Sequence, residues 1–215
     1  MAKSRKTRQK KPGQTRSGRA IPVPAKSGRF TVSALLTPKA FVIGIFLLAG
    51  AIVVPSWLAS DASEGAFDRL ALAGRGSLGQ VMSHRNLGAA HVAQGRTVLY
   101  PSRFPTSGNH WPRPLSPGFY TSAQRSEMLV HSLEHGNVVI YYETLDAGAE
   151  ESLREWAKLF TAAWSGVIVV PKPGLGKAIV LTAWTRSLRL DRFEPKAMAA
   201  FVDAFRGRGP EHPVR

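Results

Sequence analysis

Two histidines and a glutamate stand close together in the stretch MLVHSLEHGNVVIYY, near the middle of the chain. If this stretch is helical as far as His135, then His131 and His135 project from one face with Cβ atoms ~6 Å apart. Two imidazoles at this spacing can bind one metal ion through Zn–N bonds of ~2.0–2.1 Å. The pair therefore predicts a transition-metal site, with Glu134 as the nearest carboxylate.

Further ligands must come from other parts of the chain, where five of the six histidines lie between residues 84 and 135. His110, in the turn-rich stretch TSGNHWP, is the first candidate for a third ligand, and His91 is the second. Glu127 or Glu134 is expected to lie behind the ligands and to fix the tautomer of an imidazole. Because the chain has no cysteine, thiolate ligands are excluded, and zinc or copper is the expected ion.

Two other interpretations of this cluster stay open. A histidine near a helix C-terminus often interacts with the helix dipole, which would make His131 and His135 structural. HSLEH also matches the zinc-peptidase pattern H-x-x-E-H, in which both histidines bind zinc and the glutamate, here Glu134, polarises a zinc-bound water. That chemistry requires a long supporting helix and a distant acidic ligand, whereas Gly136 is expected to end the helix directly after His135.

The elements that must position these residues are predicted to form an α+β domain. Apolar periodicity indicates a helix over 122–135, a strand in NVVIYYE, a helix in AGAEESLREWAKLFTAAW, a strand in GVIVVP, one longer strand in AIVLTAWTRSLRL and a helix in EPKAMAAFVDAFRGRG. The β-α-β-β-α domain follows a stretch over 96–120 in which five prolines exclude regular helix and interior strand. Because this stretch also carries five aromatic residues, we expect a long, ordered loop.

The N-terminal part of the chain has a different composition. Residues 1–39 carry eleven Lys and Arg and no Asp or Glu, which accounts for most of the net charge of +15 and predicts a disordered basic tail. Residues 40–60 are uncharged, and a helix of this length would span the ~30 Å of a bilayer's hydrocarbon. We therefore expect a transmembrane helix over 40–60, a connector over 61–87 and a folded domain over 88–211.

The basic tail also predicts location and partners. Positive residues beside a first membrane helix stay in the cytoplasm, so the domain is expected on the outer side of a bacterial inner membrane, in the periplasm. The tail is expected to contact anionic lipid. Nucleic acid is a less favoured partner, because no aromatic residue interleaves the basic ones before Phe30.

Several motifs of the chain resemble those of a known family. HVAQGRTVLYPSRFPTSGNHWPRPLSPGFY and EMLVHSLEHGNVVIYY, with the later VIVVP, LTAWTRSL and GRGPE, resemble the bacterial membrane-anchored family called domain of unknown function 3105, over residues 88–211. The positions that match the family motif are His91, Pro105, Thr106, Ser107, Gly108, His110, Tyr120, Glu127, His131, Glu134, His135 and Gly136. The family usually reads Pro-Pro-Thr-Ser-Gly-Pro-His, so Phe104 and Asn109 replace two prolines here. The resemblance implies the membrane anchor and the site but no reaction.

The sequence thus leads to three hypotheses of different classes. The first is an extracytoplasmic domain that binds a transition metal through His110, His131 and His135, with His91 as a fourth ligand. The second is an envelope module that docks on a protein partner through the proline-rich loop, with structural histidines. The third is a zinc hydrolase that uses HSLEH, with Glu134 as its catalytic residue.

Overall fold

The computed structural model describes the chain from Ser56 to Arg215. Its helices and strands follow in the order α2 (Ser56–Gly74), the 3-10 helix η1 (Arg75–Gln80), β1 (Met82–Ser83), β2 (Gly118–Phe119), α3 (Ser126–Glu134), β3 (Val138–Tyr142), α4 (Ala147–Leu159), β4 (Val167–Pro171), β5 (Ile179–Ala183), β6 (Arg186–Leu190) and α5 (Pro195–Phe205). The domain is of the α+β class.

The six strands in this part of the chain form one mixed sheet in the order β1-β6-β5-β3-β4-β2. The central strand β3 pairs in parallel with β4 and antiparallel with β5, which continues into β6. The two-residue strands β1 and β2 lie at opposite edges, β1 antiparallel to β6 and β2 parallel to β4. The chain between them, residues 84–117 and here called the irregular segment, therefore begins at one edge of the sheet and ends at the other.

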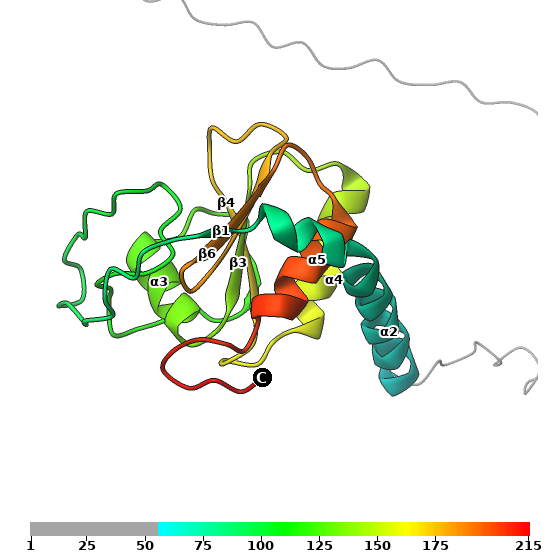
Figure 1. Cartoon of the computed structure of the whole chain (residues 1–215), viewed down its shortest axis with the longest axis horizontal. Coiled ribbons are helices and arrows are strands. Elements are labelled where there is room, and N and C mark those ends of the chain that lie inside the picture. The colour runs from blue at the N-terminus through cyan, green and yellow to red at the C-terminus, as the bar shows by residue number, and fades with distance from the viewer. Residues whose placement is uncertain (1–55) are drawn as a thin grey trace, which may run out of the picture. The chain divides into compact units, whose positions relative to one another are not determined.

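Side chains alternate between the two faces of the central strands, as the two-residue period of a strand requires. Val138 and Ile140 of β3 belong to one apolar cluster with residues of α2, α4 and α5, whereas Val139 and Tyr141 belong to a second cluster with Leu129 of α3 and the irregular segment. Figure 1 shows the corresponding layers, with α2, α4 and α5 on one side of the sheet and α3 on the other. Both faces of the sheet are therefore buried.

The fold prediction needs correction at the N-terminal side of the domain. The basic tail and residues 40–55 lie outside the described residues, but 56–60, the predicted end of a transmembrane helix, form the first turn of α2. This helix continues to Gly74 through charged residues such as Asp61 and Asp68, and Phe67 packs against Trp156 of α4 with ring centroids 5.3 Å apart. No helix within 56–215 has the length and apolar character needed to cross a membrane. The connector predicted over 61–87 contains most of α2 and all of η1.

The predicted β-α-β-β-α order also needs correction. The stretch read as one long strand is the hairpin β5–β6, which turns at Trp184 and Thr185. The turn lacks the Gly or Asn that such a position favours, and Thr185 adopts φ 57°. Two backbone hydrogen bonds hold it, from Thr185 N–H to the carbonyl of Thr106 (2.9 Å) and from His84 N–H to that of Thr185 (2.9 Å). Hydrogen bonds to residues far away in the sequence thus stabilise a turn that its own residues do not favour.

Candidate metal centre

Two short stretches of the irregular segment lie side by side and carry His91 and His110. Backbone hydrogen bonds run from Gly108 N–H to the Gly88 carbonyl (2.8 Å) and from His110 N–H to the Ala90 carbonyl (3.1 Å). A third runs from Val92 N–H to the His110 carbonyl (2.8 Å), so His91 and His110 form a parallel bridge. Their rings lie 5.1 Å apart.

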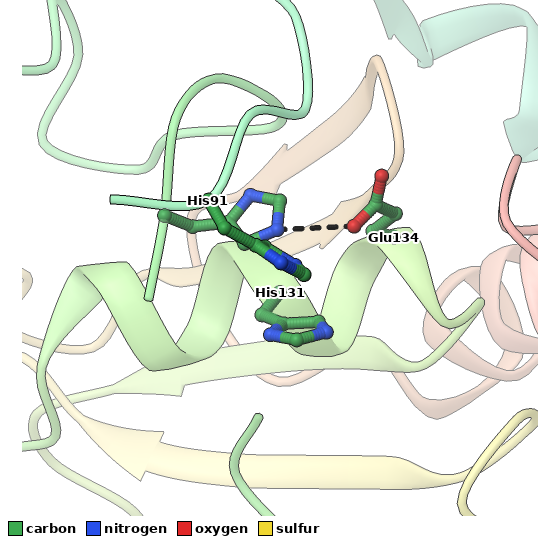
Figure 2. Close-up of side chains that lie close together, drawn as sticks. His91, His131 and Glu134 are labelled. Carbon is green, nitrogen blue, oxygen red and sulfur yellow. Dashed lines mark ion pairs between the residues drawn. The ribbon is translucent and has the colours of Figure 1, made fainter. Parts of the chain in front are cut away.

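Helix α3 supplies the other side of the cluster. His131 and Glu134 are three residues apart and therefore lie on one face of this helix. The His131 ring centroid lies 4.7 Å from that of His110 and 4.8 Å from that of His91. Figure 2 shows His91, His131 and Glu134 converging on one region, with a dashed line for the contact between Glu134 and His110.

Ser132 of α3 holds the irregular segment against this helix. Its hydroxyl is buried, accepts a hydrogen bond from Leu115 N–H (2.9 Å), and lies 2.9 Å from the Leu115 carbonyl and 3.0 Å from the Met128 carbonyl. One side chain thereby satisfies backbone groups of a segment that has no strand partner of its own at this point. This attachment joins the segment that carries His110 to the helix that carries His131.

Backbone carbonyls fix the tautomers of two imidazoles. His110 Nδ1 lies 2.8 Å from the Gly108 carbonyl, and His131 Nδ1 lies 2.7 Å from the Trp111 carbonyl. Because a carbonyl oxygen only accepts, Nδ1 of each ring must carry the proton, and Nε2 of each neutral ring presents a lone pair. Metal-bound histidines typically donate their second ring N–H in this way.

His110 Nε2 has no hydrogen-bond partner, although it is fully buried. Glu134 Oε2 lies 3.0 Å away, but the contact does not have the geometry of a hydrogen bond. The lone pair of His110 Nε2 thus faces a lone pair of Glu134 Oε2 inside the protein. Such a contact is unfavourable unless a positive charge lies between them.

The neutral state of the buried imidazoles suits a cation, whereas the shift of Glu134 favours its protonated form. Burial lowers the pKa of His110 and of His131, and neighbouring histidines lower both further. Burial also raises the pKa of Glu134, with the carboxylate of Glu211 as a second cause. Hydrogen bonds to Gly108 and Trp111 oppose the shifts of the two imidazoles but do not reverse them, so both rings are neutral near pH 7.

One ligand atom from each of His91, His110, His131 and Glu134 lies within 4.8 Å of the others. Three of these residues are buried, while His91 is exposed. This set of three imidazoles and one carboxylate, here called the inner group, could hold a metal ion.

A comparison with protein families places this arrangement in a wider context. The family model described as protein of unknown function (DUF3105) matches residues 91–215. The chain belongs to this family. The matched region begins at His91 and includes every residue of the inner group. No curated protein and no solved structure matches the chain.

His135, the second histidine of HSLEH, lies beyond the inner group in this DUF3105 domain. Its Nε2 lies 3.1 Å from Glu211 Oε2, and its ring stacks on Trp164 with centroids 3.9 Å apart. Burial lowers the pKa of His135, and the neighbouring His131 lowers it further. His131, His135 and Glu211 form a second set of possible ligands, here called the outer group.

The remaining predicted residues lie elsewhere. Glu127 accepts a hydrogen bond from Val98 N–H (3.1 Å) and pairs with Arg125 (3.5 Å), so its buried carboxylate anchors the irregular segment. Two methionines could in principle offer sulfur to a metal: Met82 is exposed on β1, and Met128 packs against the second apolar cluster.

Sequence reasoning did not find Glu211 or Trp164. No spacing rule links the C-terminal segment to HSLEH, and the connection is made by glycines. A Cβ on Gly209 would overlap the backbone of Glu134 and Gly136, so only glycine allows the C-terminal segment to approach the end of α3 this closely. The hints in the sequence are the pair of glycines, Gly207 and Gly209, just before Glu211, and the GRGPE stretch among those that resemble the family.

Proposed function

We propose that this domain binds a divalent transition metal, zinc or copper(II), through His91, His110, His131 and Glu134. The observation that carries the proposal is the buried His110 Nε2, which faces the Glu134 carboxylate at 3.0 Å without a hydrogen bond. A metal ion bound by both atoms would turn this unfavourable contact into two coordinate bonds.

The distances support a shared metal ion. Two ligands bound at ~2.0–2.1 Å in a tetrahedral site are about 3.3 Å apart, close to the separation of His110 Nε2 and Glu134 Oε2. A proton on Glu134 would also relieve this contact, and the raised pKa of Glu134 favours it. A proton, however, gives no reason for His91 and His131 to converge on the same point, whereas a metal ion does.

The donor set favours particular ions. Neutral imidazoles with one carboxylate suit zinc and copper(II), whereas copper(I) prefers sulfur. The chain has no cysteine, and the inner group is defined by nitrogen and oxygen ligand atoms alone. A carbonyl partner for Nδ1 of both His110 and His131 orients the rings before a metal arrives.

Glu134→Gln tests the proposal. The full chain, purified without a polyhistidine tag and treated with chelator, is titrated with Zn²⁺ against a competing chromophoric chelator. We expect wild type to bind one ion tightly and Glu134→Gln to bind at least about 10-fold more weakly, because loss of a direct ligand should cost no less than loss of an outer-shell partner. In chelator the variant should unfold at the same or a higher temperature, because a glutamine N–H can donate to His110 Nε2.

Controls separate a metal site from general damage. Glu155→Gln on the exposed face of α4 makes the same chemical change, and His84→Ala removes an exposed histidine that contacts Ser187. Both should bind Zn²⁺ as wild type does, whereas His110→Ala should lose the tight site. If wild type binds no ion tightly, or if His110→Ala binds it equally well, the metal proposal fails. The histidines would then brace the proline-rich loop, as expected for an interaction module.

The geometry gives the hydrolase hypothesis less support. Helix α3 has nine residues and ends at Glu134, so it is not the long helix that H-x-x-E-H chemistry requires. Glu134 also faces His110 instead of a position between His131 and His135. Location and protein partners stay predictions.

A further inference from the structure

A second group of possible ligands adjoins the inner one. His135 Nε2 and Glu211 Oε2 lie 3.1 Å apart, and a ligand atom of His131 lies within 4.8 Å of both. His135 is half-buried and Glu211 is exposed, whereas the inner group is mostly buried. This pair is thus the part of the histidine cluster that is nearest to solvent, apart from His91.

The C-terminal segment builds this second group. Hydrogen bonds run from Gly207 N–H to the Gly136 carbonyl (2.8 Å) and from Glu211 N–H to the Glu134 carbonyl (3.4 Å). The close approach of Gly209 to the end of α3 leaves no room for a side chain. These backbone contacts hold Glu211 beside His135, which itself lies against Trp164.

His131 belongs to both groups but has one free nitrogen. Its Nδ1 donates to the Trp111 carbonyl, so Nε2 alone is available to a metal. An ion in the inner group and an ion in the outer group must therefore compete for this atom. With the inner group filled, the outer group retains only His135 and Glu211.

We propose that the outer group is a second, weaker site for the same class of divalent cation, and that it shares His131 with the inner site. This inference rests on the proposed function in one respect, because His131 is a ligand in both sites. Its distinctive consequence is that loss of the inner site makes the outer one stronger. Without His110, the inner site is weakened to His91, His131 and Glu134, and the Nε2 of His131 can instead join His135 and Glu211, which gives the outer site three protein ligands.

The experiment therefore uses His110→Ala as its background. Zn²⁺ binding is measured by equilibrium dialysis for this variant, for His110→Ala with Glu211→Gln, and for His110→Ala with Glu155→Gln as the matched control. We expect the first and third proteins to bind one ion, and the second to bind it about tenfold or more weakly. His131→Ala should lose binding at both sites.

Gly209→Ala in the same background provides a second test that changes no ligand side chain. A Cβ there must displace the C-terminal segment, so binding at the outer site should weaken as it does in Glu211→Gln. Unfolding in chelator checks that each variant is folded. The proposal is overturned if His110→Ala binds no ion, or if its binding is unchanged by both Glu211→Gln and Gly209→Ala. Either result leaves the inner site intact, because that site is tested in wild type.

Discussion

The two faces of the central sheet are covered in different ways. On one face, α2, α4 and α5 bring regular apolar surfaces, and Phe201, Leu153 and Met198 are fully buried. On the other face, α3 shares the cover with an irregular segment, and the buried residues include His110, Glu127 and Ser132. Figure 1 shows this irregular cover beside α3. Both faces bury apolar side chains, but only the second also positions buried groups that can bind a metal ion.

This difference has a physical cause. Regular helices satisfy their own backbone groups, so their contact surface can be entirely apolar. An irregular segment must find partners for its N–H and C=O groups elsewhere, and here it uses polar side chains such as Ser132 and Glu127. The same need places the carbonyls of Gly108 and Trp111 against the two imidazoles. Irregular structure thus brings polar groups into the interior.

The largest expected effect concerns the helix-covered face. Phe201→Ala should reduce the free energy of unfolding by about 3–5 kcal/mol, because it leaves a cavity in a fully buried position of α5. Chemical denaturation in chelator measures this change. Zn²⁺ affinity of the folded variant should match wild type, because Phe201 belongs to the opposite face from the inner group.

Leu99→Ala provides the comparison for this variant. Leu99 is 94% exposed, so its truncation should change stability by less than about 0.5 kcal/mol. If Phe201→Ala lowered the Zn²⁺ affinity as strongly as Glu134→Gln, the two faces would not be separate in function.

A smaller effect is expected from the histidine-bearing face. Ser132→Ala should cost about 1–3 kcal/mol, because it leaves the buried N–H of Leu115 without its partner. It should also weaken Zn²⁺ binding, since the segment that carries His110 loses its attachment to α3. Ser152→Ala on α4 is the control, because that hydroxyl is exposed and contacts only the Gly148 carbonyl of its own helix. Equal Zn²⁺ affinities for the two variants would show that the attachment does not shape the site.

The smallest effect concerns the pH dependence of the metal-free chain. Burial lowers the pKa of His110, His131 and His135 below the usual 6.5, so the unfolded chain binds protons more readily than the folded one. Their contribution to stability is therefore lost as the pH falls through 6.5. The raised pKa of Glu134 acts in the opposite direction, since its contribution declines as the pH rises above 4.5.

Because three imidazoles oppose one carboxylate, the free energy of unfolding in chelator should decrease from about pH 7.5 to about pH 6. Denaturation curves across this interval measure the slope. His131→Asn should reduce the slope, whereas His84→Asn, outside the cluster, serves as the control. A slope of zero in wild type would contradict the burial of neutral imidazoles.

The sequence alone determined the family, the α+β class and most elements of the second half of the domain. The patterns of NVVIYYE, GVIVVP and the helix at EPKAMAAF are local, and hydrophobic periodicity is enough to find them. It did not determine the β5–β6 turn, because tertiary hydrogen bonds to Thr106 and His84 hold a backbone conformation that threonine rarely adopts. It also misjudged the region after residue 55, where an uncharged stretch gives way to a helix of the folded domain.

For the candidate site, too, the sequence determined some features and only the tertiary structure determined others. Composition and spacing were enough to single out His91, His110, His131 and His135, because few residue types can bind a transition metal. Only the tertiary structure decided that His110 faces Glu134, that His135 pairs with Glu211, and that backbone carbonyls fix the tautomers. These relations join segments far apart in the chain. They arise because residues 84–117 must cross the sheet from edge to edge and the C-terminal glycines must pack against the end of α3.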